Sequence, residues 1–126
     1  MKTIISTPNA PSAIGPYSQA NALDNLIFTS GQIGLIPATG ELAGGDIQTQ
    51  TRQALNNLKA ILEEAGSGMD KVLKTTVLLS DIANFTPMNE VYAEFFSADG
   101  YPSRSAFQVG ALPKGALVEI EAIAYK

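Results

Sequence analysis

The chain has 126 residues, of which 45% are hydrophobic and 16% charged, a balance typical of one globular domain with one core. It contains no cysteine and no histidine, which excludes disulfides, thiolate nucleophiles, Ser-His-Asp triads and ordinary zinc sites. The net charge of -4 gives no basic surface for nucleic acid, and no signal peptide or membrane span is recognisable. We therefore expect a cytoplasmic protein with a single domain over residues 1–126 and no nucleic-acid or membrane partner.

The first part of the chain is predicted to form three strands. Residues 2–6 are typical of a short edge strand, and a Gly-Pro pair then stiffens the loop that presents Tyr17 at the start of a second strand. The simplest interpretation of Tyr17 is a core aromatic with a hydrogen-bonded hydroxyl. Residues 26–35 are predicted to form a strand that is apolar on both faces. Gly31 within it indicates either a bulge or the close approach of another backbone or a ligand.

The middle of the chain is predicted to form a helix and a buried strand. Apolar residues recur at helical spacing over residues 46–65, with Asp46 as N-cap and Gly66 where a left-handed end is needed. Residues 72–79 form a strand that is too apolar for one face to be wet.

A second helix is predicted over residues 85–97. Its methionine and aromatic stripe belongs to the core, and its N-terminus is expected near Thr86, with a proline at the first helical position. Asn89 lies off the apolar stripe, so its simplest interpretation is an exposed polar residue.

The end of the chain contains two alternating runs, residues 101–109 and 118–124, which flank a Pro/Gly connector and predict a pair of strands. Arg104 and Glu119 form the charged pair that could face each other from a rigid sheet. A guanidinium fork suits a small carboxylate, and a strand-borne carboxylate suits a general base acting on water. The alternatives are a surface arginine or an ion pair with Glu119 or Glu121, and a solvated strand face.

The predicted order is three strands, a helix, a strand, a helix and two strands. It indicates an α+β fold with a mixed sheet of about six strands and two helices. Two helices cover only one face of such a sheet, yet at least two strands look apolar on both faces, so a second copy of the chain should cover the other face. A site made of Arg104, Glu119 and the backbone near Gly31 would lie on the uncovered side or its rim.

Several separated motifs occur in an order that identifies a family. They are Ala-Pro-x-Ala-Ile-Gly-Pro-Tyr-Ser-Gln-Ala at 10–20, Phe-Thr-Ser-Gly-Gln-Ile at 28–33, Gln-Thr-Arg-Gln-Ala-Leu-x-Asn-Leu at 50–58, Asn-x-x-Tyr-x-x-Phe-Phe at 89–96, Pro-Ser-Arg-Ser-Ala-Phe at 102–107, Gly-Ala-Leu-Pro at 110–113 and Val-Glu-Ile-Glu-Ala-Ile-Ala at 118–124. With these motifs the whole chain resembles the RidA (YjgF) family. The resemblance implies a chorismate-mutase-like α+β fold, assembled as a homotrimer with ligand clefts between subunits.

The resemblance also implies an activity, that of a 2-iminobutanoate/2-iminopropanoate deaminase, which hydrolyses reactive enamines and imines to 2-oxo acids and ammonia. It implies no cofactor and no metal. Carried over by position, Arg104 grips the substrate carboxylate and Glu119 positions and activates water. The remaining cleft residues implied by the resemblance are Tyr17, Ser30, Gly31, Asn89 and Ala106. Many family members carry cysteine at the position of Ala106. Because this chain has alanine there and no cysteine elsewhere, thiol chemistry is impossible in it.

Two other functions remain open from the sequence. The same arginine clefts could belong to a binding or regulatory protein that senses 2-oxo acids or amino-acid metabolites without turnover. An endoribonuclease or translation inhibitor is the third possibility, and the acidic charge and missing histidine argue against it.

Overall fold

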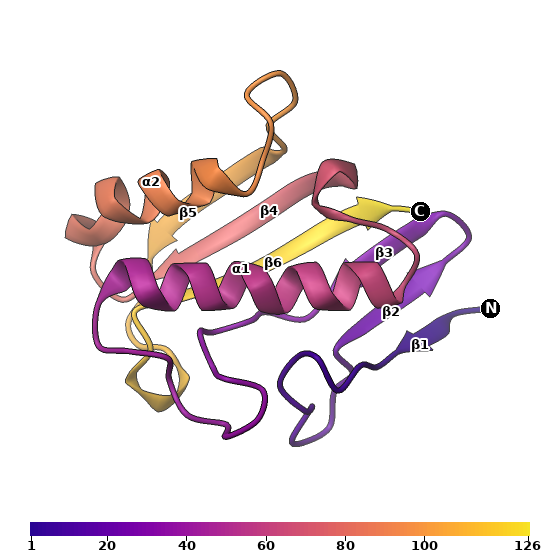
Figure 1. Cartoon of the computed structure of the whole chain (residues 1–126), viewed down its shortest axis with the longest axis horizontal. Helices are drawn as coiled ribbons and strands as arrows, with labels where there is room; N and C mark the ends of the chain where they lie inside the picture. The colour runs from indigo at the N-terminus through magenta and orange to yellow at the C-terminus, as the bar shows by residue number, and fades with distance from the viewer.

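Six strands form one mixed sheet, and both α-helices lie on the same face of it (Figure 1). The computed structural model describes residues 1–126. The strands are β1 (Thr3–Ile5), β2 (Ala20–Leu23), β3 (Leu26–Thr29), β4 (Val72–Leu79), β5 (Ser103–Gln108) and β6 (Val118–Tyr125). Their order in the sheet is β1-β2-β3-β6-β4-β5, and only the β4–β5 pair is parallel. The predicted α+β class, the six-stranded mixed sheet and the placement of two helices on one face are confirmed.

The α1 helix (Ile47–Glu64) begins and ends where the sequence indicates. The Asp46 carboxylate accepts the Thr49 N–H at 2.9 Å, and Gly66 follows the helix with a φ of 84°. Its buried face packs on the sheet, and a single cluster of 21 buried residues fills the space between the helices and the strands. No helix combines the length and apolarity that crossing a bilayer would need.

The α2 helix (Phe85–Glu94) ends earlier than predicted, and its N-cap lies two residues before the expected position at Thr86. Asn84 occupies the N-cap position, so Pro87 is the third helical residue rather than the first. That position still suits proline, because the first four N–H groups of a helix have no intrahelical acceptor. Three connections contain a short 3₁₀ segment: Met69–Lys71 between α1 and β4, Ile82–Asn84 between β4 and α2, and Pro113–Gly115 between β5 and β6.

The strand predicted over residues 26–35 ends at Thr29, so the prediction is wrong for its second half. Beyond Thr29 a single bridge pairs Gln32 with Ile120, and the chain then leaves the sheet. A Cβ atom on Gly34 would lie 2.5 Å from the Gln50 carbonyl oxygen, so this segment runs directly against α1. Close packing on the helix replaces strand pairing there.

The two C-terminal strands are not neighbours, because β4 lies between them. Arg104 is paired with Thr75, whose side chain is buried on the helix-covered face, whereas Glu119 is paired with Leu78 on the open face. The expectation that Arg104 and Glu119 face each other is therefore wrong within one chain. Thr75 and Leu78 are three residues apart on β4, so the residues paired with them point to opposite faces of the sheet.

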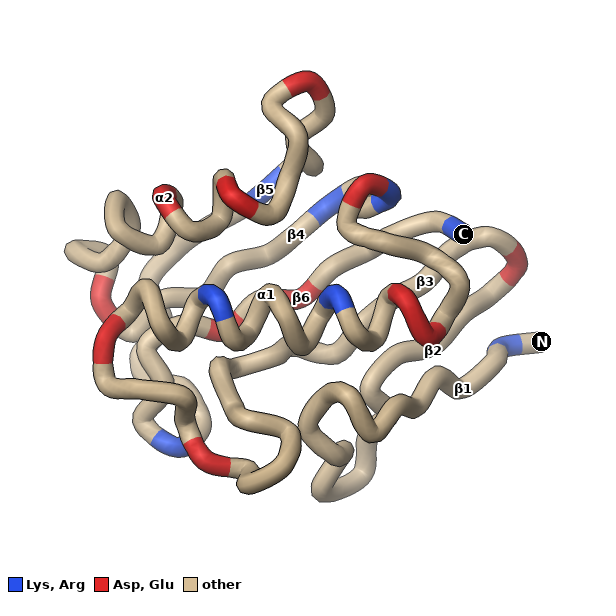
Figure 2. Tube along the Cα trace, in the orientation of Figure 1, with Lys and Arg blue, Asp and Glu red and all other residues tan.

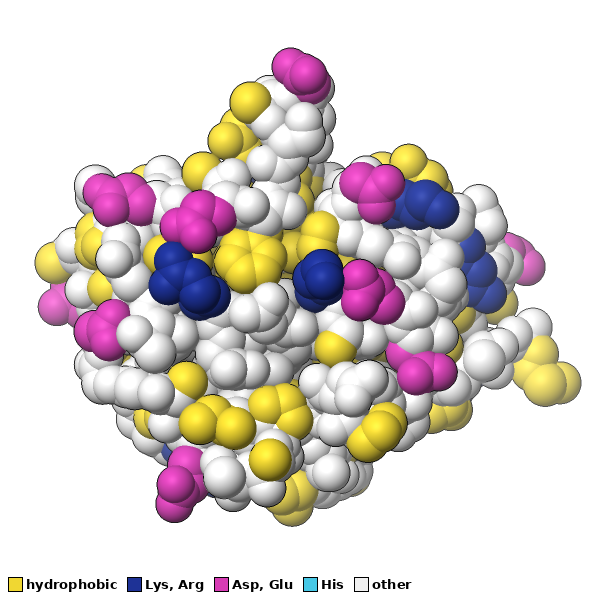
Figure 3. Space-filling view, in the orientation of Figure 1, with side chains coloured by type: hydrophobic (Ala, Val, Ile, Leu, Met, Phe, Trp, Pro, Cys, Tyr) yellow, Lys and Arg dark blue, Asp and Glu magenta, His cyan; other side chains and the backbone are white.

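The open face of the sheet is partly apolar. Its exposed hydrophobic side chains include Ile4, Leu23, Leu26, Phe28, Phe107 and Tyr125. On the helix-bearing face, positive and negative side chains are interspersed (Figure 3), and acidic and basic residues are scattered along the whole chain (Figure 2). That face shows no extended basic surface.

Candidate functional site

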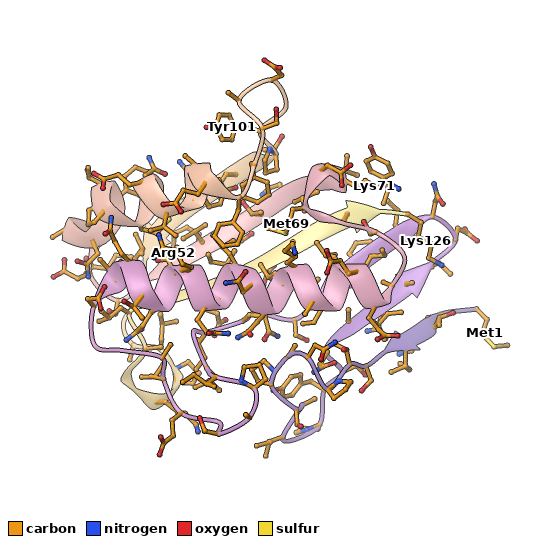
Figure 4. All side chains as sticks on the ribbon, in the orientation of Figure 1. Met1, Arg52, Met69, Lys71, Tyr101 and Lys126 are labelled. Carbon is orange, nitrogen blue, oxygen red and sulfur yellow. The ribbon has the colours of Figure 1, made fainter.

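Arg104 lies in a cavity of about 480 Å³ between β5, α2 and the loop that joins them. Tyr101 and Pro102 form the loop side of this cavity, and Tyr101 projects from that loop (Figure 4). Asn89 and Tyr92 form the helix side. We call this cavity the arginine pocket.

The guanidinium of Arg104 is held in place from one side. Its carbon atom lies 4.7 Å from the ring centre of Tyr92 and 5.3 Å from that of Phe85, and its Nη1 donates to the Asn89 Oδ1 at 2.5 Å. The buried hydroxyls of Tyr92 and Thr75 lie 2.7 Å apart and share a hydrogen bond, which fixes the ring. Burial raises the pKa of Tyr92, against a smaller lowering by that hydrogen bond and by the arginine, so the phenol stays neutral. No carboxylate forms a salt bridge with Arg104.

Glu119 lines a second cavity, of about 770 Å³, at the rim of the open face. We call it the glutamate pocket. Its polar lining includes Tyr17, Ser30 and Lys114, and its wall is formed by the segment before Tyr17 and the loop after β3. Burial, and then the neighbouring Glu121, raise the pKa of Glu119 above the ordinary glutamate value of 4.5. No lysine or arginine forms a salt bridge with this carboxylate.

Gly31 is the residue against which the Glu119 carboxylate rests. A Cβ atom at Gly31 would lie 2.5 Å from the Glu119 Oε2 and 2.8 Å from its carboxyl carbon, so any side chain at this position would displace the carboxylate. The group that approaches Gly31 is thus a side chain of the same chain, which neither interpretation of Gly31 specified. The neighbouring backbone is fixed, since Gln32 and Ile120 exchange two hydrogen bonds, at 2.8 and 3.0 Å.

Two buried amides of α1 also hold the loops around the glutamate pocket. Gln50 accepts from the Leu117 N–H at 2.8 Å and donates to the Gly44 carbonyl at 2.8 Å. Asn57 donates to the carbonyls of Ile33 and Leu35, at 3.3 and 2.9 Å. Sequence analysis missed both residues. The available signal was a pair of polar side chains on the core-facing stripe of an amphipathic helix.

The cleft residues implied by the resemblance fall into two groups. Tyr17, Ser30 and Gly31 line the glutamate pocket with Glu119, and Tyr17 is 51% exposed, so its interpretation as a core aromatic is wrong. Asn89 lines the arginine pocket and is half-buried, so its interpretation as an exposed residue is wrong as well.

Ala106 lines neither pocket. It lies two residues beyond Arg104 on the same side of β5 and packs against the core. The structure therefore contains an arginine pocket without a salt-bridged carboxylate and a glutamate pocket without a salt-bridged cation, and Arg104 and Glu119 lie on opposite faces of one sheet. No three or more acidic residues gather in a way that could hold a metal ion.

Comparisons with known proteins agree with this arrangement of elements. The model of the endoribonuclease L-PSP family matches residues 7–126. A RutC family protein of Pyrococcus horikoshii is 56% identical over 126 residues, which covers 100% of this chain and 99% of the relative. The human protein named 2-iminobutanoate/2-iminopropanoate deaminase is 49% identical over 124 residues, covering 98% of this chain and 90% of the human protein.

Solved structures of related proteins also superimpose closely on this chain. A protein of the Rid family from Yersinia pestis superimposes with a TM-score of 0.97 at 50% identity, and all of both chains is covered. The crystal structure of Escherichia coli TdcF with bound serine gives a TM-score of 0.93 at 46% identity, covering 98% of each chain. The chain thus belongs to the endoribonuclease L-PSP family, the family of the RidA and YjgF proteins, as its motifs indicate.

Proposed function

We propose that this chain hydrolyses small 2-imino acids, such as 2-iminopropanoate and 2-iminobutanoate, to 2-oxo acids and ammonia. Relatives about half identical over nearly the whole chain, from human, cattle and mouse, are named 2-iminobutanoate/2-iminopropanoate deaminase. The observation that carries the proposal is the pair of incomplete pockets. Arg104 is preorganised without a salt-bridged carboxylate, and Glu119 is partly desolvated without a salt-bridged cation.

Arg104 is suited to bind the carboxylate of such a substrate. Asn89 accepts one N–H from Nη1, and the aromatic rings fix the plane of the guanidinium, which leaves its other N–H groups for a bidentate contact. Little side-chain freedom is lost on binding, because the fork is already oriented. In TdcF the bound ligand is serine, an amino acid that carries the same carboxylate.

Glu119 is suited to handle the protons of the reaction. An imine carbon is already electrophilic, so the chemistry needs an oriented substrate and an activated water. Glu119 takes a proton from water as the oxygen attacks the carbon of the protonated C=N group, which gives a neutral carbinolamine. Glu119 then returns this proton to the nitrogen, the C–N bond breaks and ammonia leaves, and the hydroxyl proton passes to Glu119 as the C=O bond forms. Its raised pKa makes Glu119 a stronger base than an exposed glutamate.

The complete cleft requires two copies of the chain, because Arg104 and Glu119 lie on opposite faces of the sheet. We propose a homotrimer in which the arginine pocket of one subunit closes on the glutamate pocket of the next. The exposed apolar side chains of the open face, which a monomer would leave in water, support association through that face.

A coupled assay tests the proposed activity. A dehydratase generates 2-iminopropanoate in the presence of semicarbazide, which traps the imine, and the yield of trapped product is measured with and without this protein. A deaminase lowers that yield and increases the 2-oxo acid formed. An unchanged yield with wild-type protein refutes the activity.

A metabolite-binding protein without turnover is the second candidate, and the serine bound to TdcF favours it as well. The two functions differ at Glu119. Both functions predict that Arg104→Ala abolishes the binding of serine measured by calorimetry. Only the enzyme has an imine-hydrolysing activity that Glu119→Ala abolishes while serine still binds. The family's endoribonuclease description receives no support from the charge of this chain, since its net charge is -4.

A further inference from the structure

The segment between β1 and β2 forms a wall of the glutamate pocket but has almost no backbone structure of its own. Four of its residues line the pocket: Pro11, Ser12, Ile14 and Tyr17. Three prolines within it lack an N–H group. Among backbone–backbone hydrogen bonds, only the one from the Tyr17 N–H to the Gly15 carbonyl, at 2.9 Å, lies inside residues 7–17. Another group must therefore fix this wall.

That group is the side chain of Gln19, which is only 3% exposed. Its Oε1 accepts the Thr7 N–H at 2.7 Å. Its Nε2 lies 2.7 Å from the Pro11 carbonyl oxygen, 3.1 Å from that of Thr7 and 3.4 Å from that of Ala10, so the two N–H groups of one amide serve three carbonyls. A single carboxamide thus binds the whole first half of the wall.

Gln19 also joins this wall to the site of the proposed general base. Its backbone carbonyl accepts the Ser30 N–H at 2.9 Å, and the Ser30 hydroxyl donates to the Ser18 carbonyl at 2.6 Å. Ser30 precedes Gly31, on which the Glu119 carboxylate rests. The wall and the base are therefore built on one hydrogen-bonded unit.

We infer that Gln19 is a positioning residue of the cleft, whose carboxamide holds residues 7–17 so that Tyr17 and Ile14 face the substrate. Gln19 does not line the pocket itself. The inference rests on the proposed function, because it assigns the glutamate pocket to the substrate. Glutamine is required by chemistry: a glutamate offers acceptors only, and a leucine leaves one N–H and three carbonyls without partners.

The test compares Gln19→Leu with Ile61→Val, a core substitution on α1 that touches neither pocket and serves as a matched control for lost stability. Two measurements that need no turnover are made: calorimetric titration with serine, and the rate of chymotrypsin cleavage after Tyr17. We expect Gln19→Leu to raise the Kd for serine about tenfold and the cleavage rate about tenfold, because the wall opens locally. We expect Ile61→Val to lower the Tm without either change.

Kinetics and a second variant complete the test. With 2-iminobutanoate, Gln19→Leu should raise KM about tenfold and change kcat by less than about threefold. If Gln19→Leu fails to fold, Gln19→Glu, which keeps the shape of the side chain and loses its donors, should show the same pattern. Wild-type serine affinity or unchanged cleavage after Tyr17 in the folded variant overturns the inference, and so do equal effects in Ile61→Val.

The two proposals fail in different ways. If wild type hydrolyses no imine but Gln19→Leu still loses serine affinity and gains cleavage after Tyr17, the deaminase proposal fails and the role of Gln19 stands. If wild type does not bind serine, the rate of chymotrypsin cleavage after Tyr17 tests the role of Gln19 by itself. A cleavage rate that Gln19→Leu leaves unchanged then overturns the inference.

Discussion

Mixing two inactive variants tests whether the site lies between chains. Arg104→Ala and Glu119→Ala each remove one charged group from the proposed cleft. Loss of one partner of a desolvated charge pair costs about 2–5 kcal/mol, so each variant alone should retain roughly 3% of wild-type kcat/KM or less. Because the two side chains occupy opposite faces of one sheet, a cleft with both groups can form when an intact Arg104 of one subunit meets an intact Glu119 of another.

The expected recovery follows from counting. If the two variants are refolded together in equal amounts and assemble at random, half of the subunits supply Arg104 and half of their neighbours supply Glu119, so about a quarter of the clefts are complete. The initial rate of 2-oxobutanoate formation should rise to about a quarter of the wild-type rate. A mixture no more active than the separate variants would refute a site shared between chains.

The double variant provides the control. Arg104→Ala/Glu119→Ala is mixed in equal amounts with wild type and refolded in the same way. About a quarter of the clefts are then complete if they form between chains, but about half if each chain holds its own site. A rate near one half would show that the charged groups meet within one chain after a rearrangement.

Four further predictions concern the environment of the two pockets. Gly31→Ala should push the Glu119 carboxylate out of place and lower kcat about 100-fold, whereas Gly45→Ala, where an added Cβ meets nothing, should leave activity unchanged. In a thermal melt at pH 7, Glu119→Gln should raise the Tm, and it should abolish turnover. Because the pKa of Glu119 is raised in the folded state, the free energy of unfolding falls as the pH rises from the unfolded-state pKa to the folded-state pKa, and a neutral glutamine avoids this loss. The acid limb of the kcat profile should lie above pH 4.5, and Glu121→Gln should move it lower, because a like charge no longer raises the pKa of Glu119. Tyr92→Leu should raise KM about tenfold by removing the ring under the guanidinium, and Tyr92→Phe, which keeps the ring, by less than about threefold. A Gly31→Ala enzyme as active as wild type, a Glu119→Gln melt below the wild-type Tm, or equal KM values for the two Tyr92 variants would each contradict the corresponding interpretation.

Local patterns are sufficient to predict most elements of this fold. The α1 helix follows from its apolar spacing, the Asp46 cap and Gly66, and β4 follows from a continuous apolar run over residues 72–79. The α2 start was misplaced because proline suits any of the first helical positions. The strand after Thr29 was overextended because its apolar residues pack on α1 rather than in the sheet.

The buried amides mark a different limit of sequence reasoning. Gln19, Gln50 and Asn57 are each 3% exposed or less, and each binds backbone groups of loops outside its own helix or strand. The core-facing stripe of α1 indicates that Gln50 and Asn57 are buried, but nothing local identifies the groups that such an amide binds. Its partners are carbonyls and N–H groups whose positions exist only after the loops fold.

The sequence by itself determined the family, the α+β class and the identities of the charged residues. Each of these depends on local chemistry or on the residues themselves. Only the tertiary structure decided that β4 separates β5 from β6, and that the register of the two pairings puts Arg104 and Glu119 on opposite faces of the sheet. Strand order is set by long-range pairing, which side-chain alternation along a single strand does not encode.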